Sequence, residues 1–250
     1  DYPNANIYLE VDQKLIKLVR TWYPEASDVW PMGLNDTNGV AEYAKFDYQI
    51  PSGSLPAIYC NSEDKLHTLR YRTLGVSDQK RSDLLGDFGQ KYKTVVGISW
   101  RSMLLTKDRI NDYVNAEAFK SLIAEAPTNV GFVLLQYAIQ EEERALFREF
   151  DNVLIPSQDF LNEVDMNAVY AGSCDLLVSC GTVVATMAGI FNTPVISWCK
   201  FDDPVNLGQE QNPWFPNRYD IRVMPNWDKV VLMGRLKKIL KKYLDLTLKK

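Results

Sequence analysis

Residues 175–198, with the sequence DLLVSCGTVVATMAGIFNTPVISW, constrain the fold more than any other stretch. The apolar run at 176–179 predicts a buried strand, and the run at 183–191 predicts a helix. Asn192, Thr193 and Pro194 break that helix before a second apolar run at 195–198. A strand, a helix and a second strand within about two dozen residues predict one compact parallel βαβ unit.

The turn between the first strand and the helix contains Gly181 and Thr182. In open parallel sheets, ligands bind at the carboxyl ends of the strands, where helix N-termini present free backbone amides. Glycine lets a ligand approach the backbone, and threonine can cap the helix or bind an anionic oxygen. The same two residues also fit an ordinary capped turn without a ligand, so the turn alone leaves both interpretations open.

The alternation of strands and helices extends over residues 93–226. Strands are predicted at Val95–Trp100, Val130–Gln136, Val153–Pro156, Leu176–Ser179, Val195–Trp198 and Ile221–Met224, and helices at Ala116–Ala126, Glu141–Phe150, Glu163–Ser173 and Val183–Phe191. This rhythm is typical of a parallel sheet that is covered by helices on both faces. The sequence therefore predicts an α/β protein with a Rossmann-like, doubly wound parallel sheet of at least five strands.

Two further regions flank this predicted domain. Residues 1–92 are expected to form a partial N-terminal α/β domain and a linker, with strands at Ala5–Val11, Val29–Met32 and Phe46–Ile50, a helix at Asp12–Tyr23, and a polar bridge at 61–92. Residues 227–250 are expected to form a long C-terminal helix at Asp228–Leu248. Its basic face, with Lys237, Lys238, Lys241 and Lys242, fits peripheral contact with an anionic membrane, or a solvated outer face of a packed helix.

Composition narrows the class of function. The chain has 250 residues and a net charge of −4, which gives no reason to expect a nucleic-acid partner. With one histidine and four cysteines without zinc-like spacing, no metal site is expected. The cysteines are interpreted as small buried residues in a reducing compartment, so a cytoplasmic location is expected. The apolar runs are too short to span a bilayer, and no GxGxxG or Walker motif follows a predicted strand.

Polar residues follow four of the predicted strands. They are Ser99, Trp100 and Arg101 after the first, Gln136 and Tyr137 after the second, Ser157 and Gln158 after the third, and Gly181, Thr182 and Val183 after the fourth. The carboxyl ends of parallel strands meet at one edge of the sheet. An arginine, amide and hydroxyl groups and a helix N-terminus at that edge suit a diphosphate with an attached nucleoside.

Four stretches carry a resemblance to a known family: VGISWRS at 96–102, FVLLQY at 132–137, residues 175–198, and NPWFPN at 212–217. Their order and spacing make residues 94–240 similar to the C-terminal, donor-binding half of GT-B glycosyltransferases. The similarity is greatest to heptosyltransferase-like enzymes and to bacterial glycosyltransferases associated with tetratricopeptide repeats. The resemblance implies a cytoplasmic, metal-independent transferase that needs no cofactor and moves a sugar from a nucleotide-diphosphate donor to an acceptor. It also implies that Arg101 meets the phosphates, Gln136 lines the donor cleft, and Thr182 with the following amides holds the diphosphate.

Two positions depart from that family. Gly181 stands where the family usually has aspartate, and Thr186 stands where it usually has histidine. Residues 1–92 would represent the acceptor side only in part, and Asp12, Asp47 and His67 are the candidate general bases. Because the chain begins at Asp1, it is expected to be a piece of a longer protein. Because its acceptor side is expected to be incomplete, the chain by itself is expected to bind donor weakly and to transfer no sugar. The alternatives are a catalytically inactive module that binds a nucleotide sugar or a partner, and an unrelated α/β enzyme such as a relative of sugar-nucleotide epimerases.

Overall fold

A computed structural model describes residues 4–32, 45–60, 62–68, 72–104, 110–200, 203–225 and 227–247. The chain divides into two compact units, residues 1–72 and 73–250.

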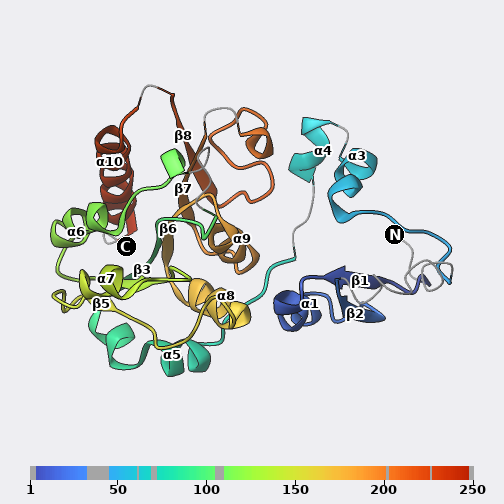
Figure 1. Cartoon of the computed structure of the whole chain (residues 1–250), viewed down its shortest axis with the longest axis horizontal. Helices are drawn as coiled ribbons and strands as arrows, with labels where there is room; N and C mark the ends of the chain where they lie inside the picture. Colours follow the sequence, from blue (N-terminus) through green and yellow to red (C-terminus); the bar gives the residue numbers. More distant parts are fainter. Residues whose placement is uncertain are drawn as a thin grey trace. The chain divides into compact units, whose positions relative to one another are not determined.

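The first unit contains a small parallel βαβ arrangement (Figure 1). Strand β1 (Tyr8–Val11) pairs with β2 (Asp28–Pro31), and the 3-10 helix η1 (Gln13–Leu15) and helix α1 (Ile16–Trp22) connect them. Two short helices, α3 (Leu55–Tyr59) and α4 (Glu63–Thr68), follow a 3-10 turn at Ser52–Ser54. The predicted strands at 5–11 and 29–32 and the predicted helix at 12–23 are therefore confirmed; the first strand and the helix are shorter than predicted, and the second strand begins and ends one residue earlier.

The strand predicted at Phe46–Ile50 is wrong, because this segment forms no strand. The Phe46 ring packs at centroid distances of 5.1 Å from Tyr8 and 5.7 Å from Trp30. The segment thus contacts the small sheet through an aromatic side chain and not through backbone pairing. Apolar residues that pack in this way produce the same short sequence pattern as a strand.

The second unit is built on a six-stranded, wholly parallel sheet with the order β5-β4-β3-β6-β7-β8. Its strands are β3 (Thr94–Ser99), β4 (Val130–Leu134), β5 (Val153–Leu154), β6 (Leu176–Cys180), β7 (Val195–Lys200) and β8 (Arg218–Val223). Its helices are α5 (Asp78–Lys91), α6 (Ala116–Ala124), α7 (Glu141–Ala145), α8 (Val164–Ser173), α9 (Val183–Ile190) and α10 (Lys229–Thr247), with 3-10 turns η3 (Ile110–Asp112) and η4 (Pro204–Asn206). The predicted α/β class and doubly wound parallel sheet are confirmed.

The core lies on both faces of this sheet, because successive strand residues point to opposite sides. On one face, α6, α10 and the turn after α7 bury Phe119, Leu236 and Phe147, respectively, in the cluster that includes residues of β3, β4 and β6. On the other face, α5, α8 and α9 bury Leu85, Tyr170 and Val184. Figure 1 shows α6 and α10 on one side of the sheet and α8 and α9 on the other.

The second unit begins at Thr73 and not at Lys93, the start of the predicted sheet domain. Helix α5 packs on α8 and contributes the buried Leu85 to the core. The sequence signal for this packing was weak because the helix is mostly polar and is kinked at Gly86, where φ is +50°.

The long C-terminal helix is confirmed as α10. It buries Leu232, Met233, Leu236, Leu240 and Leu244. Lys237 binds Glu125 at 2.6 Å, whereas Lys238, Lys241 and Lys242 are exposed. Peripheral membrane contact through this basic face stays a prediction. Within the part of the chain that the structure describes, no helix is both long and apolar enough to cross a membrane.

Candidate functional site

All the predicted site residues lie at or just beyond the carboxyl ends of β3, β4, β5 and β6, at the same edge of the parallel sheet. The strand order separates them into groups, because β3 lies between β4 and β6. Two strand spacings, about 10 Å, therefore separate the end of β4 from the end of β6.

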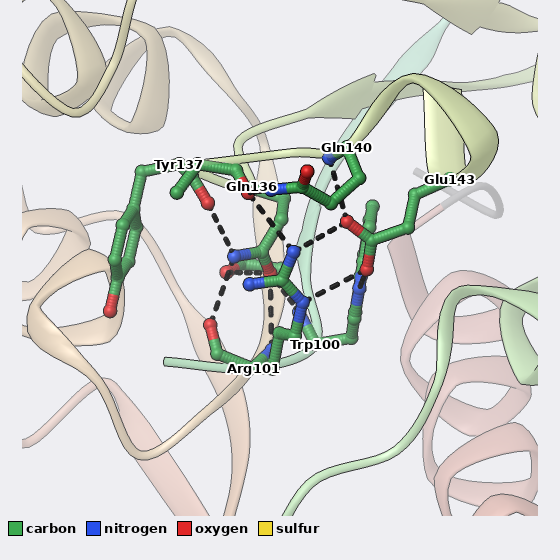
Figure 2. Close-up of polar contacts among 8 residues, drawn as sticks. Trp100, Arg101, Gln136, Tyr137, Gln140 and Glu143 are labelled. Atoms are coloured by element: carbon green, nitrogen blue, oxygen red, sulfur yellow. Dashed lines mark hydrogen bonds and ion pairs between the residues drawn. The ribbon is translucent and has the colours of Figure 1, made fainter. Parts of the chain in front are cut away.

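The first group is a hydrogen-bonded knot centred on the side-chain amide of Gln136 (Figure 2). Its Oε1 accepts from Ser99 Oγ at 3.2 Å, from the Trp100 amide at 2.9 Å and from the Arg101 amide at 3.1 Å. Its Nε2 donates to the carbonyl oxygens of Arg101 at 3.0 Å and Tyr137 at 2.8 Å. Gln136 is only 2% exposed, and this amide joins the ends of β3 and β4 where backbone pairing stops.

Glu143, a residue that the sequence did not single out, completes the knot (Figure 2). It accepts from Trp100 Nε1 and Arg101 Nε, each at 2.9 Å, and from Arg101 Nη2 at 2.5 Å. It also accepts from the Gln140 amide, which forms a capping box at the start of α7. Burial raises the pKa of Glu143, but hydrogen bonds from Arg101, the Gln140 amide and Trp100 outweigh it, so the pKa lies below its usual value of 4.5.

The knot corrects two of the predicted ligand contacts. Trp100 is fully buried, and its ring packs against Phe119 and Phe147 at centroid distances of 6.0 and 5.3 Å. Ser99 is also fully buried and donates its hydroxyl to Gln136. Both side chains belong to the core, because a residue that ends a central strand is covered by helices on both faces.

Arg101 is held by this knot but retains one free edge. Its Nε and Nη2 bind Glu143, and Nη2 also donates to the carbonyl of Ala138 at 3.0 Å. Its Nη1 has no acceptor among the described residues, and 14% of the side chain is exposed. Arg101 therefore keeps a donor for a ligand, although its charge is already balanced by Glu143.

The second group lines a cavity of about 210 Å³ between the ends of β4 and β5. Its walls combine the apolar side chains of Leu134, Ile139, Ile155 and Phe160 with polar Gln136, Arg144, Ser157, Gln158 and Asp159. Gln158 Oε1 accepts from the Tyr170 hydroxyl at 3.2 Å, which fixes its orientation. A cavity that combines apolar walls with oriented polar groups suits a flat heterocycle. Tyr137 does not line this cavity; it is half-buried, and burial raises the pKa of its hydroxyl.

The third group is the turn between β6 and α9, and here polar groups remain unsatisfied. The Gly181 amide donates to the Trp198 carbonyl at 2.9 Å, and the Thr182 amide donates to the Cys180 carbonyl at 2.7 Å. Neither amide is therefore available to a ligand. The next two amides, of Val183 and Val184, have no backbone acceptor among the described residues and form the open N-terminus of α9.

The hydroxyl of Thr182 is also unsatisfied. Thr182 is the N-cap residue of α9, but its side chain makes no capping hydrogen bond. Its Oγ1 is buried and has no hydrogen-bond partner within the described part of the chain. Burial raises the pKa of the neighbouring Cys180 thiol to about 12, and an interaction with the Thr182 side chain has the smaller, opposite effect. The protonated thiol is only a weak hydrogen-bonding group and does not satisfy Oγ1. A buried hydroxyl without a partner is costly, and a bound anionic oxygen would satisfy it.

Three of the four cysteines, Cys174, Cys180 and Cys199, are buried, and Cys60 is half-buried. All four are free thiols, as the sequence predicted. Burial raises the pKa of each buried thiol to about 12, so none of the three is a reactive thiolate.

Solved structures of glycosyltransferases share this architecture. The ADP-heptose lps heptosyltransferase II of E. coli is 14% identical, with a TM-score of 0.66 over 97% of this chain and 91% of that chain. The chain has the GT-B fold. The E. coli heptosyltransferase WaaC with ADP is 13% identical, with a TM-score of 0.57 over 96% of this chain and 91% of that chain. A family 9 glycosyl transferase from Veillonella parvula is 14% identical, with a TM-score of 0.57 over 96% of this chain and 83% of that chain.

These similarities are structural, and at such low identity they establish the fold alone. No protein-family model matches the chain, and no curated protein matches its sequence. The solved structures nevertheless confirm, at the level of the fold, the resemblance to heptosyltransferase-like GT-B proteins that the sequence indicated. What the chain binds has to be argued from its own site.

Proposed function

We propose that the chain is a glycosyltransferase that takes its sugar from a nucleotide-diphosphate donor. The observation that carries this proposal is the turn between β6 and α9. There, two open amides and a buried, unsatisfied Thr182 hydroxyl lie at a strand end of a GT-B fold. A diphosphate would accept from the amides of Val183 and Val184 and from Thr182 Oγ1.

The rest of the donor would extend along the edge of the sheet. The nucleobase would occupy the cavity between the ends of β4 and β5, with Ser157 and Gln158 on its polar side and Ile155 and Phe160 against the ring faces. Arg101 would contribute Nη1 at the end of β3, between the cavity and the turn. Transfer then requires stabilisation of the leaving diphosphate and a general base for the acceptor hydroxyl.

The residues of the second unit supply the first of these requirements. Open amides at a helix N-terminus stabilise the charge that builds on the leaving diphosphate. Asp12, Asp47 and His67 stay the candidates for the general base.

Calorimetric titration with ADP, UDP and GDP tests the donor site. Thr182→Val keeps the branched shape and removes the hydroxyl, so it should lower affinity for the preferred nucleotide by about 1–2 kcal/mol. Thr128→Val, in an exposed turn before β4 at the opposite edge of the sheet, is the matched control and should leave affinity unchanged. Equal affinity in the unaltered chain and the Thr182→Val variant would contradict the proposed site.

The competing hypothesis is a module that binds the nucleotide sugar without turnover. Gly181 and Thr186, at positions where the resembling family has aspartate and histidine, favour it. Release of nucleoside diphosphate from the donor that binds best, measured with and without acceptors, separates the two. Saturable binding with no release in a chain of full length would favour the inactive module.

A further inference from the structure

A buried ion pair on β8 lies beside the proposed phosphate site. Arg218, the first residue of β8, has only 8% of its side chain exposed, and Asp220 is fully buried. Arg218 Nε donates to Asp220 Oδ1 at 2.8 Å, and Nη2 lies 3.4 Å from Ser197 Oγ on the neighbouring strand β7. Burying two charges is costly, so a pair of this kind is weak evidence for a role in stability.

The loop before β8 fixes the pair in place. Asp220 Oδ2 accepts from Asn212 Nδ2 at 2.8 Å, and the Asp220 amide donates to the Glu210 carbonyl at 2.7 Å. The Asn212 amide in turn donates to the Arg218 carbonyl at 2.9 Å. Asn212 opens the NPWFPN stretch, so this part of the sequence positions the carboxylate that orients Arg218.

The guanidinium group extends from β8 to the turn that opens α9. A Cβ placed on Gly181 would lie 3.7 Å from Arg218 Nη2, which is ordinary van der Waals contact. Arg218 Nη1 has no acceptor among the described residues. The positive group therefore lies beside residue 181, in the turn that also holds the unsatisfied hydroxyl of Thr182.

We infer that Arg218 binds the diphosphate of the donor and that Asp220 is its positioning residue. The inference rests on the proposed function. A guanidinium offers several donors in a fixed plane, and its hydrogen bonds to phosphate oxygens are charge-assisted. Asp220 balances the charge while the site is empty, and the N-terminus of α9 attracts the same anion. Arg218 thereby adds a cation to a turn that otherwise offers only neutral donors.

The same geometry accounts for the glycine at position 181. Gly181 has no left-handed backbone conformation, and an added Cβ would meet its nearest neighbour, the Trp198 carbonyl oxygen, at 3.4 Å. Neither the backbone nor the space around it requires glycine. An aspartate there would instead place a carboxylate against Arg218, where it would compete with the ligand for the guanidinium.

Calorimetric titration of the full chain with ADP, UDP and GDP, and with the nucleoside of the one that binds best, tests this assignment. Arg218→Gln should weaken binding of the diphosphate at least about tenfold and leave nucleoside binding unchanged. Arg218→Lys should restore part of the loss, because it keeps the charge without the planar group. Arg81→Gln, which removes the same charge from an ion pair with Asp175 just before β6, at the opposite edge of the sheet, is the matched control and should change neither affinity.

The double variant Arg218→Gln, Asp220→Asn guards against misfolding, because it replaces both charges by neutral side chains of similar size. It should show the same selective loss of diphosphate affinity. If Arg218→Gln weakens nucleoside and diphosphate binding equally, or weakens neither of them, the assignment is wrong. If Thr182→Val weakens binding and Arg218→Gln does not, the proposed function stands and this inference fails. If no nucleotide binds the unaltered chain, both fail.

A pair of substitutions at Gly181 gives an independent readout. Gly181→Ala adds only a Cβ that the turn accommodates. Gly181→Asp adds the carboxylate that the resembling family carries, and it should lower diphosphate affinity at least about tenfold more than alanine does. Stronger diphosphate binding by the aspartate variant than by the alanine variant would contradict a role for Arg218.

Discussion

The ends of β3 and β4 and the end of β6 carry the same kinds of polar residue, but the structure treats them differently. Around Gln136 and Glu143, the hydrogen bonds join groups within the fold, and five of them converge on the Gln136 amide alone. At the β6–α9 turn, the Thr182 hydroxyl and the amides of Val183 and Val184 find no partner in the described chain. The polar groups of the first region hold two strands together, whereas those of the second stay open, as the proposed diphosphate site requires.

Whether a polar group is already satisfied by the fold identifies ligand-binding candidates better than the residue type does. An arginine or a glutamine after a strand is a ligand candidate only if its donors are not already used by the fold. Substitutions in the knot around Gln136 should therefore act on stability, and substitutions at the β6–α9 turn should act on binding. The following predictions test that division, from the largest expected effect to the smallest.

The largest loss of stability is expected for Gln136→Ala. It leaves the amides of Trp100 and Arg101 and the buried Ser99 hydroxyl without their acceptor, so the free energy of unfolding should fall by about 3–4 kcal/mol. The exposed Gln90 is the matched control, and Gln90→Ala should change it by less than about 0.5 kcal/mol. Urea denaturation followed by circular dichroism measures both. A stable Gln136→Ala variant that fails to bind nucleotide would place Gln136 in the ligand site instead.

A smaller loss is expected for Glu143→Ala. The variant leaves the guanidinium of Arg101 and the indole N–H of Trp100 without their acceptor, at a cost of about 2–3 kcal/mol in unfolding free energy. The exposed Glu142 lies in the same first turn of α7 and isolates the effect of charge near a helix N-terminus. Glu142→Ala should cost about 0.5 kcal/mol. Equal losses in the two variants would show that the knot adds nothing beyond the helix dipole.

The low pKa of Glu143 predicts a smaller, pH-dependent effect. Because the folded pKa is below the unfolded value of 4.5, the unfolded chain takes up the proton first as the pH falls. The stabilisation is fully present above pH 4.5 and is lost as the pH falls through the folded pKa. Glu143→Gln has no carboxyl to titrate, so its urea midpoint should depend less on pH between 3 and about 5 than that of the unaltered chain. Identical pH profiles would mean that Glu143 is not held by Arg101 in solution.

The sequence predicted the sheet well because a continuous run of apolar residues is a local signal for a buried strand. The buried runs that form β3, β4, β6 and β7 are set by neighbouring residues, and only their bounds moved. Whether each polar group has a hydrogen-bond partner is not a local property, because its partners lie far along the chain. Arg101 meets Glu143, 42 residues away, and the Gly181 turn meets Arg218 from β8. The signal for Arg218 was its place directly after NPWFPN, but only the folded chain brings it to α9.

The smallest effect on stability is expected for Thr182→Val, although Thr182 occupies an N-cap position. Removing a capping side chain typically costs about 1 kcal/mol. Here the side chain makes no capping bond, and its hydroxyl is buried without a partner, so that cost does not apply. Valine removes an unsatisfied polar group and keeps the shape, so the free energy of unfolding should stay within about 0.5 kcal/mol or rise. Urea denaturation without nucleotide measures this, and a loss of 1 kcal/mol or more would show that the hydroxyl is used by the fold. Unchanged or higher stability together with weaker nucleotide binding would show that the Thr182 hydroxyl serves binding, whereas the Gln136 amide serves stability.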